Sequence, residues 1–335
     1  MGGRLIDIAR KVGVSEATVS RVLNDKPGVS QEVRDAVLTA VDVLGYERPA
    51  RLRMERGRLV GLVLPELVNP IFPAFAEVIG GALVQQGFTP VLCTRSAGGV
   101  SEAEYVDLLI EQQVSGVIFV GGLCSEEAAD HGHYLRLHRL GMPVVLINAA
   151  VDTVPFPRVT CDDALAMRCA MKHLSSLGHT RIGLLLGPID HVPSNLKLAG
   201  ARAMAAEQGW DWNPELVVHS QYSVEAAQAA TVGLLAGGVT AIACASDMMA
   251  LGAIRAARRA GLRVPEDISV VGYDDSVLMN STSPALTTLR QPIETMGASA
   301  VDLLARAIVS GAEQVRELLF EPALVVRDST AMIAS

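Results

Sequence analysis

The sequence lacks the features that would place the chain in a membrane or outside the cell. No run of 18 apolar residues occurs in its 335 residues, and the opening MGGR leads directly into a helical pattern. The five cysteines are widely spaced and odd in number, with no Cys-x-x-Cys pair, which is typical of buried thiols in a reducing compartment. We therefore expect a cytoplasmic protein with no membrane partner.

Motifs of the common enzyme classes are also missing. The sequence contains no GxGxxG, GxxxxGK[ST], GxSxG or HExxH pattern. His131 and His133 form a His-x-His pair, but no cysteine or carboxylate completes an evident ligand set. We interpret the pair as two histidines at a helix start. The chain is expected to be no enzyme and to need neither a metal nor a cofactor.

Composition and charge indicate several domains with an unequal division of charge. Hydrophobic residues make up 50% of the chain and mean hydropathy is +0.34, which is enough for two cores beyond a small helical unit. The net charge is −8, yet residues 1–58 carry 11 basic and 8 acidic side chains. The rest of the chain is strongly acidic. This distribution favours a nucleic-acid contact at the amino-terminal end.

Residues 4–46 have the pattern of three short helices around one small core. Gly13 separates the first two helices, while Ser15 and Ser30 are placed to cap the second and third. The apolar positions recur at helical spacing: Leu5, Ile8, Ala9 and Val12, then Val19, Val22 and Leu23, then Val33, Val37, Val41 and Leu44. The pattern fits a DNA-binding helix-turn-helix unit or a plain helical subdomain.

From Arg58 onward, short apolar runs rich in β-formers alternate with helical patterns. A first series ends with PVVLI at 143–147, and a second begins with RIGLLLG at 181–187. Alternation of this kind predicts parallel α/β sheets. We expect two similar α/β lobes in tandem.

The run ATVSRVLN, followed by a helix with a VS cap and by LGY, resembles the headpiece of the lac repressor family. The resemblance extends over roughly residues 3–330. It implies an α/β protein with an N-terminal three-helix helix-turn-helix headpiece at 1–46 and a bilobed periplasmic-binding-protein-like core of two doubly wound parallel sheets at 59–335. Arg4 departs from the family, where many relatives have a capping Ser or Thr.

The resemblance also implies that the chain crosses between the lobes three times, near Thr160, Thr288 and Glu321. The first lobe would then comprise 59–160 and 289–320, and the second 161–288 and 321–335. Periodicity alone does not show this interleaving.

The charged segment 47–58 is short and has Pro49 at a plausible first helical position. A solvated linker is the simple interpretation. The resemblance implies a hinge that becomes helical on operator DNA, where a leucine wedge opens a minor-groove step. Because the segment looks shorter than the usual pattern, Leu52 is the first candidate for the wedge and Met54 the second.

The outward face of the second helix carries the candidate DNA contacts Glu16, Ala17, Ser20, Arg21 and Asn24. A guanidinium can bond guanine O6 and N7 together, which suits Arg21. The resemblance places Glu16 and Ala17 at the family's specificity positions, although Glu16 would also stabilise a helix N-terminus. Ser15, Asn24 and Ser30 are expected at phosphates.

Candidate effector contacts follow several different strands, where lobes of this type close over a ligand. They match the family's effector positions one by one: Asn69, Phe72, Asn148, Lys197, Tyr222, Ser246 and Asp274. An aromatic ring among polar side chains suits a sugar. Taken alone, Asp274 would fit a turn and Tyr222 a core. Asn148, Lys197 and Ser246 depart from the Asp, Arg and Asn that are frequent there, so the ligand should differ from that of the lac repressor.

Stretches such as GYERP, PELVNPIFPAFAEVIG and CASDMMALG look closest to the maltose and amylase regulators of this family. The resemblance therefore implies a homodimeric repressor on double-stranded operator DNA, with a sugar, first a malto-oligosaccharide, as small-molecule effector. No leucine heptad follows residue 310, so we expect no tetramer. A purine-type corepressor-dependent regulator and a sugar-binding transport protein remain alternatives. The headpiece and the missing export signal argue against the latter.

Overall fold

We describe the fold from a computed structural model. The structure describes residues 2–23, 26, 28–44, 59–95, 98–148, 151–311 and 317–333. The chain divides into an amino-terminal unit and a larger unit that begins at Val60, and each is described by itself. No helix within these ranges is long and apolar enough to cross a membrane.

The amino-terminal unit contains three helices, α1 (Gly2–Val12), α2 (Glu16–Leu23) and α3 (Gln31–Val43). Their apolar faces meet in one small core, in which Ile8, Val19, Val22, Val37 and Val41 are buried. This arrangement confirms the predicted helix-turn-helix. Helix α1 begins two residues before Arg4, so Arg4 lies inside the helix and does not take the place of a cap.

Two serines stabilise the helix starts as the sequence predicts. The Ser15 hydroxyl accepts a hydrogen bond from the backbone N–H of Thr18 at 3.1 Å, and the Ser30 hydroxyl accepts one from Val33 at 3.4 Å. Each bond satisfies a backbone donor that has no partner within its own helix. Gly13 adopts φ +75° between α1 and α2, a conformation that favours glycine. The turn between α1 and α2 therefore follows from the Ser15 cap and from the conformation of Gly13.

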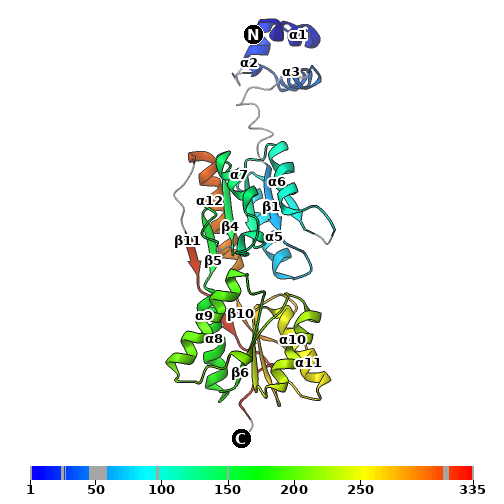
Figure 1. The fold of residues 1–335 in the computed structure, drawn as a ribbon. Helices are drawn as coiled ribbons and strands as arrows, with labels where there is room; N and C mark the ends of the chain where they lie inside the picture. The colour runs from blue at the N-terminus through cyan, green and yellow to red at the C-terminus, as the bar shows by residue number, and fades with distance from the viewer. Residues whose placement is uncertain are drawn as a thin grey trace. The chain divides into compact units, whose positions relative to one another are not determined.

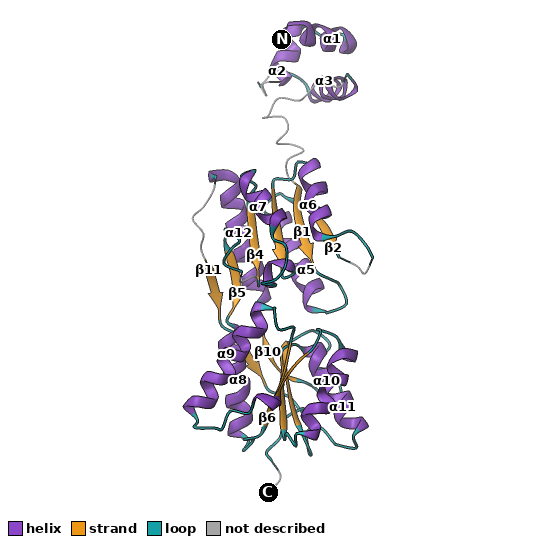
Figure 2. Cartoon of the chain, viewed as in Figure 1, coloured by secondary structure: helices purple, strands orange, loops and turns teal. Residues whose placement is uncertain are grey.

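The larger unit contains two six-stranded sheets flanked by helices (Figures 1 and 2). The first sheet has the strand order β11 (Glu317–Phe320), β5 (Arg158–Cys161), β4 (Val144–Ile147), β3 (Gly116–Val120), β1 (Leu59–Leu64) and β2 (Thr89–Thr94). The second has the order β12 (Ala323–Val325), β10 (Thr287–Arg290), β9 (Ser269–Asp274), β8 (Ala241–Cys244), β6 (Ile182–Leu186) and β7 (Val217–His219). The predicted α/β class with two parallel sheets is confirmed.

Helices cover both sheets. Those of the first lobe are α5 (Ile71–Gln85), α6 (Glu102–Glu111), α7 (Gly132–Arg139) and α12 (Ile293–Ser310), with the short 3-10 turn η1 (Leu123–Ser125). Those of the second lobe are α8 (Asp163–Ser176), α9 (Val192–Glu207), α10 (Val224–Ala236) and α11 (Asp247–Arg259), with η2 (Pro214–Leu216). Helices α8 and α9 lie on one side of the second sheet and α10 and α11 on the other (Figure 1).

Alternate side chains of the central strand β3 show why this sheet needs two helical layers. Ile118 and Val120 pack in the core formed with α5 and α12. Phe119, on the opposite face, stacks edge to face on Tyr134 of α7 with ring centroids 4.9 Å apart. A strand buried on both faces reads as a continuous apolar run, as GVIFV does.

The chain passes between the two sheets after β5, after β10 and after β11. Leu289 and Arg290 belong to β10, so the return to the first lobe lies two residues later than the predicted start at 289. Cys161 likewise still belongs to β5 of the first sheet. The parallel strands of each sheet end on the side where these crossings occur, and that side holds the site described below.

Strand β12 is the exception to the parallel arrangement, since it pairs antiparallel with β10. The physical reason is its direction of entry. The chain leaves β11 at the carboxyl end of the first sheet and reaches β12 within three residues. A strand that enters from the crossing side must run opposite to neighbours that end there.

Helices α8 and α9 pack in close contact at Gly200. A Cβ atom added there would lie 2.2 Å from the carbonyl oxygen of Ala164, which no side chain tolerates. Gly233 on α10 is different, because an added Cβ would meet no atom within 4 Å. Glycine at 200 therefore sets the spacing of the helix that carries Lys197.

We predict that Gly200→Ala lowers the free energy of unfolding by about 1–3 kcal/mol, because overpacking forces the two helices apart. The matched variant Gly233→Ala should raise it by up to about 1 kcal/mol, since alanine reduces the entropy of the unfolded chain. Urea denaturation followed by circular dichroism measures both changes. Equal effects of the two substitutions would contradict the close contact.

Candidate functional site

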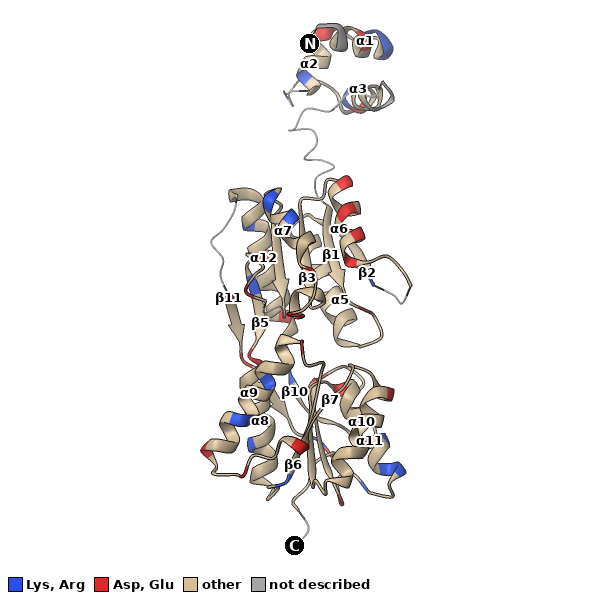
Figure 3. Cartoon of the chain, in the orientation of Figure 1, with Lys and Arg blue, Asp and Glu red and all other residues tan. Residues whose placement is uncertain are grey.

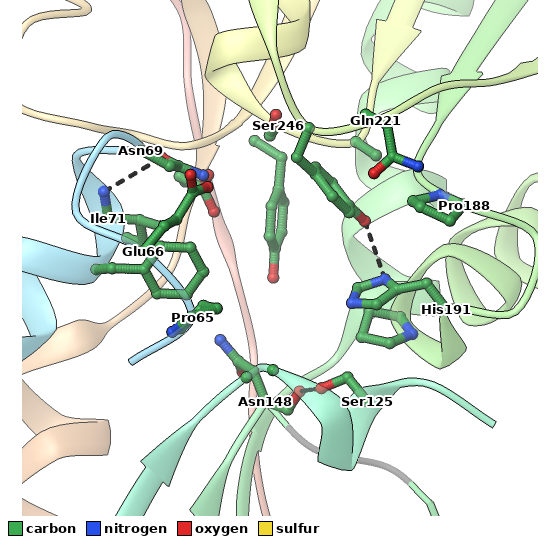
Figure 4. A pocket seen from close by; sticks show the side chains of 18 of the residues that line it. Pro65, Glu66, Asn69, Ile71, Ser125, Asn148, Pro188, His191, Gln221 and Ser246 are labelled. Atoms are coloured by element: carbon green, nitrogen blue, oxygen red, sulfur yellow. Dashed lines mark hydrogen bonds between the residues drawn. The ribbon is translucent and has the colours of Figure 1, made fainter. Parts of the chain in front are cut away.

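A cavity of about 520 Å³ lies where the carboxyl ends of the two sheets face each other. Residues of both lobes line it: the segments after β1, β2, β3, β4, β6, β7, β8 and β10 contribute, together with the last two residues of β9. Figure 4 shows Glu66 and Asn69 on one side of the cavity, His191 and Gln221 on the opposite side, and Asn148 with Ser125 along a third. A volume of this size is ordinary for a small-molecule site.

All seven residues predicted to contact an effector line this one cavity: Asn69, Phe72, Asn148, Lys197, Tyr222, Ser246 and Asp274. Two of them also have local structural contacts. The Asn69 side chain accepts a hydrogen bond from the N–H of Ile71 at 3.3 Å, and Ser246 caps α11 by accepting from Met249 at 3.2 Å. Their positions are thus fixed before any ligand arrives.

Lys197 is the buried cation of the cavity. Its ammonium group donates a hydrogen bond to the carboxylate of Asp163, the first residue of α8. It also lies 3.9 Å from the centroid of the Tyr273 ring. Burial raises the pKa of Asp163, and the nearby Lys197 acts in the opposite direction. The pair joins α8, α9 and β9 in one wall of the cavity.

A chain of hydrogen bonds crosses from one lobe to the other through Gln291. The Asn148 side-chain amide donates to Gln291 Oε1 at 2.8 Å, and Gln291 Nε2 donates to Asp274 Oδ1 at 2.7 Å. Asn148 has φ +52° and Asp274 has φ +118°, conformations that are costly for residues other than glycine. Such strain at the ends of β4 and β9 is typical of a functional site.

Tyr222 closes another part of the cavity together with Ser194 and His191. The Tyr222 hydroxyl lies 2.9 Å from Ser194 Oγ and 3.1 Å from His191 Nδ1. Burial and, secondarily, Lys197 lower the pKa of His191 to about 4. The ring is therefore neutral near pH 7. Gly187 leaves room for the phenol, since a Cβ there would lie 2.3 Å from the Tyr222 oxygen.

Asp247 lies behind the cavity at the start of α11. Its carboxylate accepts hydrogen bonds from the Thr288 hydroxyl at 2.6 Å and from the Ser276 N–H at 2.7 Å. Burial raises the pKa of Asp247 to about 7. Burial, reinforced by Asp247, raises the pKa of Asp274 well above its ordinary value. Two buried carboxyl groups thus lie close together on the second lobe.

Several cavity residues were missed at the sequence level, among them Glu66, Arg95, Ser125, Asp163, His191, Tyr273 and Gln291. Most of them share one signal, since they follow the carboxyl end of a strand directly or within a few residues. Asp163 and Gln291 stand just past β5 and β10, at crossings between the lobes. Their partners lie far away in sequence. No group of three or more His, Cys, Asp or Glu side chains in the described ranges is arranged to hold a metal ion.

The amino-terminal unit presents the predicted DNA-facing residues on its surface. On α2, Glu16, Ala17 and Arg21 are exposed and Ser20 is half-buried, whereas Val19 and Val22 are fully buried. Ser15 and Ser30 are exposed at the helix starts, where they serve as caps. The predicted contacts Asn24 and Leu52, the second wedge candidate Met54 and the hinge segment 47–58 lie outside the described residues.

We predict that Asp247→Asn weakens the pH dependence of stability. Because the pKa of Asp247 is higher in the folded state than in the unfolded chain, its stabilising contribution is complete below about pH 4 and is lost as pH rises through 7. Between about pH 5 and pH 8, the wild type should lose on the order of 2 kcal/mol more unfolding free energy than the variant.

The exposed substitution Asp211→Asn is the control for that experiment and should keep the wild-type slope. The lowered pKa of His191 makes stability change with pH in the opposite direction between about pH 4 and pH 6.5. Because the wild type and both variants contain His191, its effect drops out when their slopes are compared. Urea denaturation at each pH measures the difference. Identical slopes in wild type and Asp247→Asn would contradict the raised pKa.

Two family profiles match the chain. The profile of bacterial regulatory proteins of the lacI family matches residues 4–49, and that of the periplasmic binding protein-like domain matches residues 171–330. The chain is 52% identical to the HTH-type transcriptional regulator reg1 of Streptomyces lividans over 336 residues, which covers 99% of this chain and 97% of the relative. It is also 52% identical to the HTH-type transcriptional regulator MalR of Streptomyces coelicolor, with the same coverage.

Solved structures agree with the sequence comparisons. A complex of the transcriptional regulator CelR with cellobiose matches with a TM-score of 0.73 and 32% identity, over 97% of this chain and 99% of that chain. The lac repressor dimer bound to operator and the anti-inducer ONPF matches with a TM-score of 0.73 and 30% identity, over 97% and 98%. The chain is a DNA-binding transcriptional regulator, not an enzyme, and it belongs to the lacI family of bacterial regulatory proteins.

Proposed function

We propose that the chain is a homodimeric repressor that binds a near-palindromic operator and that a sugar, most specifically a malto-oligosaccharide, controls this binding. Residues 1–46 would read DNA, 47–58 would act as a hinge with Leu52 as its wedge, and 59–335 would bind the effector and the second subunit. The observation that carries the proposal is the combination, in one chain, of an exposed second helix and an interlobe cavity.

The DNA-binding part rests on the outward face of α2. Basic residues lie on α2 and at the end of α1 (Figure 3), where Arg10 and Lys11 form the last turn. We assign base contacts to Arg21, Glu16 and Ala17, since they are the exposed residues of the helix. Ser15, Ser20 and Ser30 would contact phosphates or flank them.

The dimer would use one edge of the first lobe. Strand β2 is an edge strand of the first sheet, and its Leu92 is 48% exposed. Val84 on the neighbouring α5 is 61% exposed. An open strand edge beside exposed apolar side chains favours association with another chain. A second copy also matches the two-fold symmetry of a palindromic operator.

The charges of the cavity favour an uncharged effector. Five acidic residues line it, Glu66, Glu126, Asp163, Asp190 and Asp274, against the two cations Arg95 and Lys197. Burial raises the pKa of Asp274 well above its ordinary value and favours its neutral form, so the other four are counted as negative charges. Lys197 is already paired with Asp163. A phosphorylated or otherwise anionic ligand would be repelled, whereas hydroxyl groups can donate hydrogen bonds to carboxylates. Phe72, Tyr222 and Tyr273 offer apolar faces for sugar rings.

A malto-oligosaccharide is supported by similarity and by size. The regulator MalR is 52% identical over almost the whole chain, and a structural relative binds cellobiose, a disaccharide. A cavity of about 520 Å³ suits more than one sugar ring. A single purine base, the ligand of the competing corepressor hypothesis, would leave much of this volume unfilled.

Arg21→Ala tests the DNA-binding assignment. Loss of a bidentate guanine contact should weaken operator binding by about 1–3 kcal/mol and reduce discrimination against unrelated DNA. Arg259→Ala on α11 removes the same charge from an exposed site of the larger unit and should bind the operator like wild type. Fluorescence anisotropy with labelled operator at fixed salt measures both. An unchanged operator affinity for Arg21→Ala removes Arg21 from the base-reading surface.

A thermal-shift panel of maltose, maltotriose, glucose 6-phosphate and hypoxanthine tests the effector. We expect stabilisation by the two uncharged glucose oligomers and release of operator DNA in their presence. Tyr222→Phe should weaken sugar binding about threefold to tenfold through loss of one hydroxyl hydrogen bond. Tyr105→Phe, whose hydroxyl bonds Thr94 outside the cavity, should bind like wild type. Stabilisation by hypoxanthine alone would favour the corepressor hypothesis instead.

A further inference from the structure

Glu102 is a buried acid that takes no part in lining the cavity. It is the first residue of α6 and is 3% exposed. Burial of a carboxylate costs free energy unless hydrogen-bond donors surround it, so the partners of Glu102 must offset that cost. Three of them converge on this one group, and they come from two different segments, α7 and the loop after β3.

The carboxylate of Glu102 is pressed against the backbone of the loop after β3. Its Oε2 accepts a hydrogen bond from the Leu123 N–H at 3.4 Å. The same oxygen lies 2.8 Å from the place where a Cβ of Gly122 would be. Its Oε1 accepts from the Tyr134 hydroxyl and lies 3.0 Å from His133 Nε2. Glu102 thus joins α6, α7 and this loop.

His131 fastens the same loop from its other side. Its Nε2 lies 3.0 Å from the carbonyl oxygen of Leu123 and 3.0 Å from that of Glu126. A ring N–H at this position can donate to both carbonyls. The His-x-His pair noted in the sequence therefore serves one loop, His131 directly and His133 through Glu102.

The loop in question, residues 121–127, forms part of the cavity wall and reaches the second lobe. Ser125 donates to the Asn148 carbonyl at 2.8 Å within the first lobe. The Glu127 N–H donates to the carbonyl oxygen of Asp190 at 2.9 Å, and Glu126 forms an isolated antiparallel bridge with His191. Asp190 and His191 follow β6 of the second lobe. The loop therefore supplies the first-lobe half of a backbone bridge across the cleft.

We propose that Glu102 is a positioning residue for closure of the two lobes: it holds loop 121–127 in the shape that forms the bridge to Asp190 and His191, without touching the ligand. A loop already fixed before closure loses little conformational entropy when the bridge forms. The link from closure to effector binding rests on the proposed function. The bridge itself consists only of residues of the protein, so its dependence on Glu102 can be tested without knowing the effector.

The bridge is made by backbone groups. The Glu127 N–H and the Asp190 carbonyl form its hydrogen bond, and Glu126 pairs with His191 through the main chain. Burial raises the pKa of the Glu126 side chain, and the nearby Arg95 acts in the opposite direction. A backbone bridge needs its loop in one conformation, which the contacts of Glu102 and His131 with Leu123 and Glu126 provide.

Glu102→Gln tests the proposal, because an amide replaces one acceptor oxygen with a donor and leaves fewer acceptors for the same three partners. Asp107→Asn is the matched control: Asp107 lies on the same helix, is exposed, and pairs with Arg136 of α7. Figure 3 shows the acidic residues along α6 and the basic ones on α7. Hydrogen–deuterium exchange of the full chain without ligand is the first measurement.

We expect amides of 121–127 and of 188–194 to exchange about tenfold faster in Glu102→Gln, while β8 exchanges as in wild type. Faster exchange at 188–194, on the other lobe, is the readout that a purely local role would not produce. Wild-type exchange at 188–194, or a uniform increase over both lobes, would overturn the proposal. Should Glu102→Gln fail to fold, His131→Ala opens the loop from its other side, with His138→Ala on the exposed part of α7 as control.

Titration with maltotriose is the second measurement. If the sugar binds the wild type, Glu102→Gln should bind it about tenfold more weakly and Asp107→Asn equally well. Failure of maltotriose to bind any variant would count against the proposed effector and leave the exchange result to decide on the positioning role. Equal affinity of Glu102→Gln and wild type would overturn that role.

Discussion

The buried ion pair of Lys197 and Asp163 determines how the cavity is built. Removing two opposite charges from water costs several kcal/mol per ion, and direct contact offsets that cost only when the geometry is held. Here Asp163 is held at the start of α8, Lys197 on α9 and the Tyr273 ring on β9. The close approach of α8 and α9 at Gly200 fixes the distance between the two charges. Loss of either partner would leave a buried charge in the cavity wall.

The two lobes are joined in two physically different ways. Near the crossings, the network of Asn148, Gln291 and Asp274 lies beside the covalent connections, so its members cannot move far apart. The bridge from Glu127 to Asp190 has no covalent connection beside it. A relative rotation of the lobes would therefore break the bridge first, while the three crossings would serve as the axis of that rotation. Backbone strain at Asn148 and Asp274 lies where such a rotation would be absorbed.

The sequence predicted the composition of the cavity better than its internal contacts. Parallel strands place the segments after their carboxyl ends at one edge, so Asn69, Asn148 and Asp274 could be assigned to a common site from strand order. The family resemblance supplied Lys197 and Tyr222. Neither route revealed that Lys197 pairs with Asp163, because that contact depends on the packing of α9 against α8. Neither revealed that Gln291 links the lobes, because that contact depends on the crossing after β10. Glu102 was missed because its partners Leu123, His133 and Tyr134 are brought together only by the tertiary packing of the first lobe.

Control of DNA binding by a small molecule requires that the ligand bind two arrangements of the lobes with different affinity. A ligand that contacts only the first lobe, through Asn69 and Phe72, would bind the open and closed arrangements equally and would shift nothing. Under the proposed function, contacts of the effector with Lys197 and Tyr222 of the second lobe would create the difference. The effector must therefore span the cavity. A sugar meets this requirement because its rim of hydroxyl groups can form hydrogen bonds with side chains of both walls.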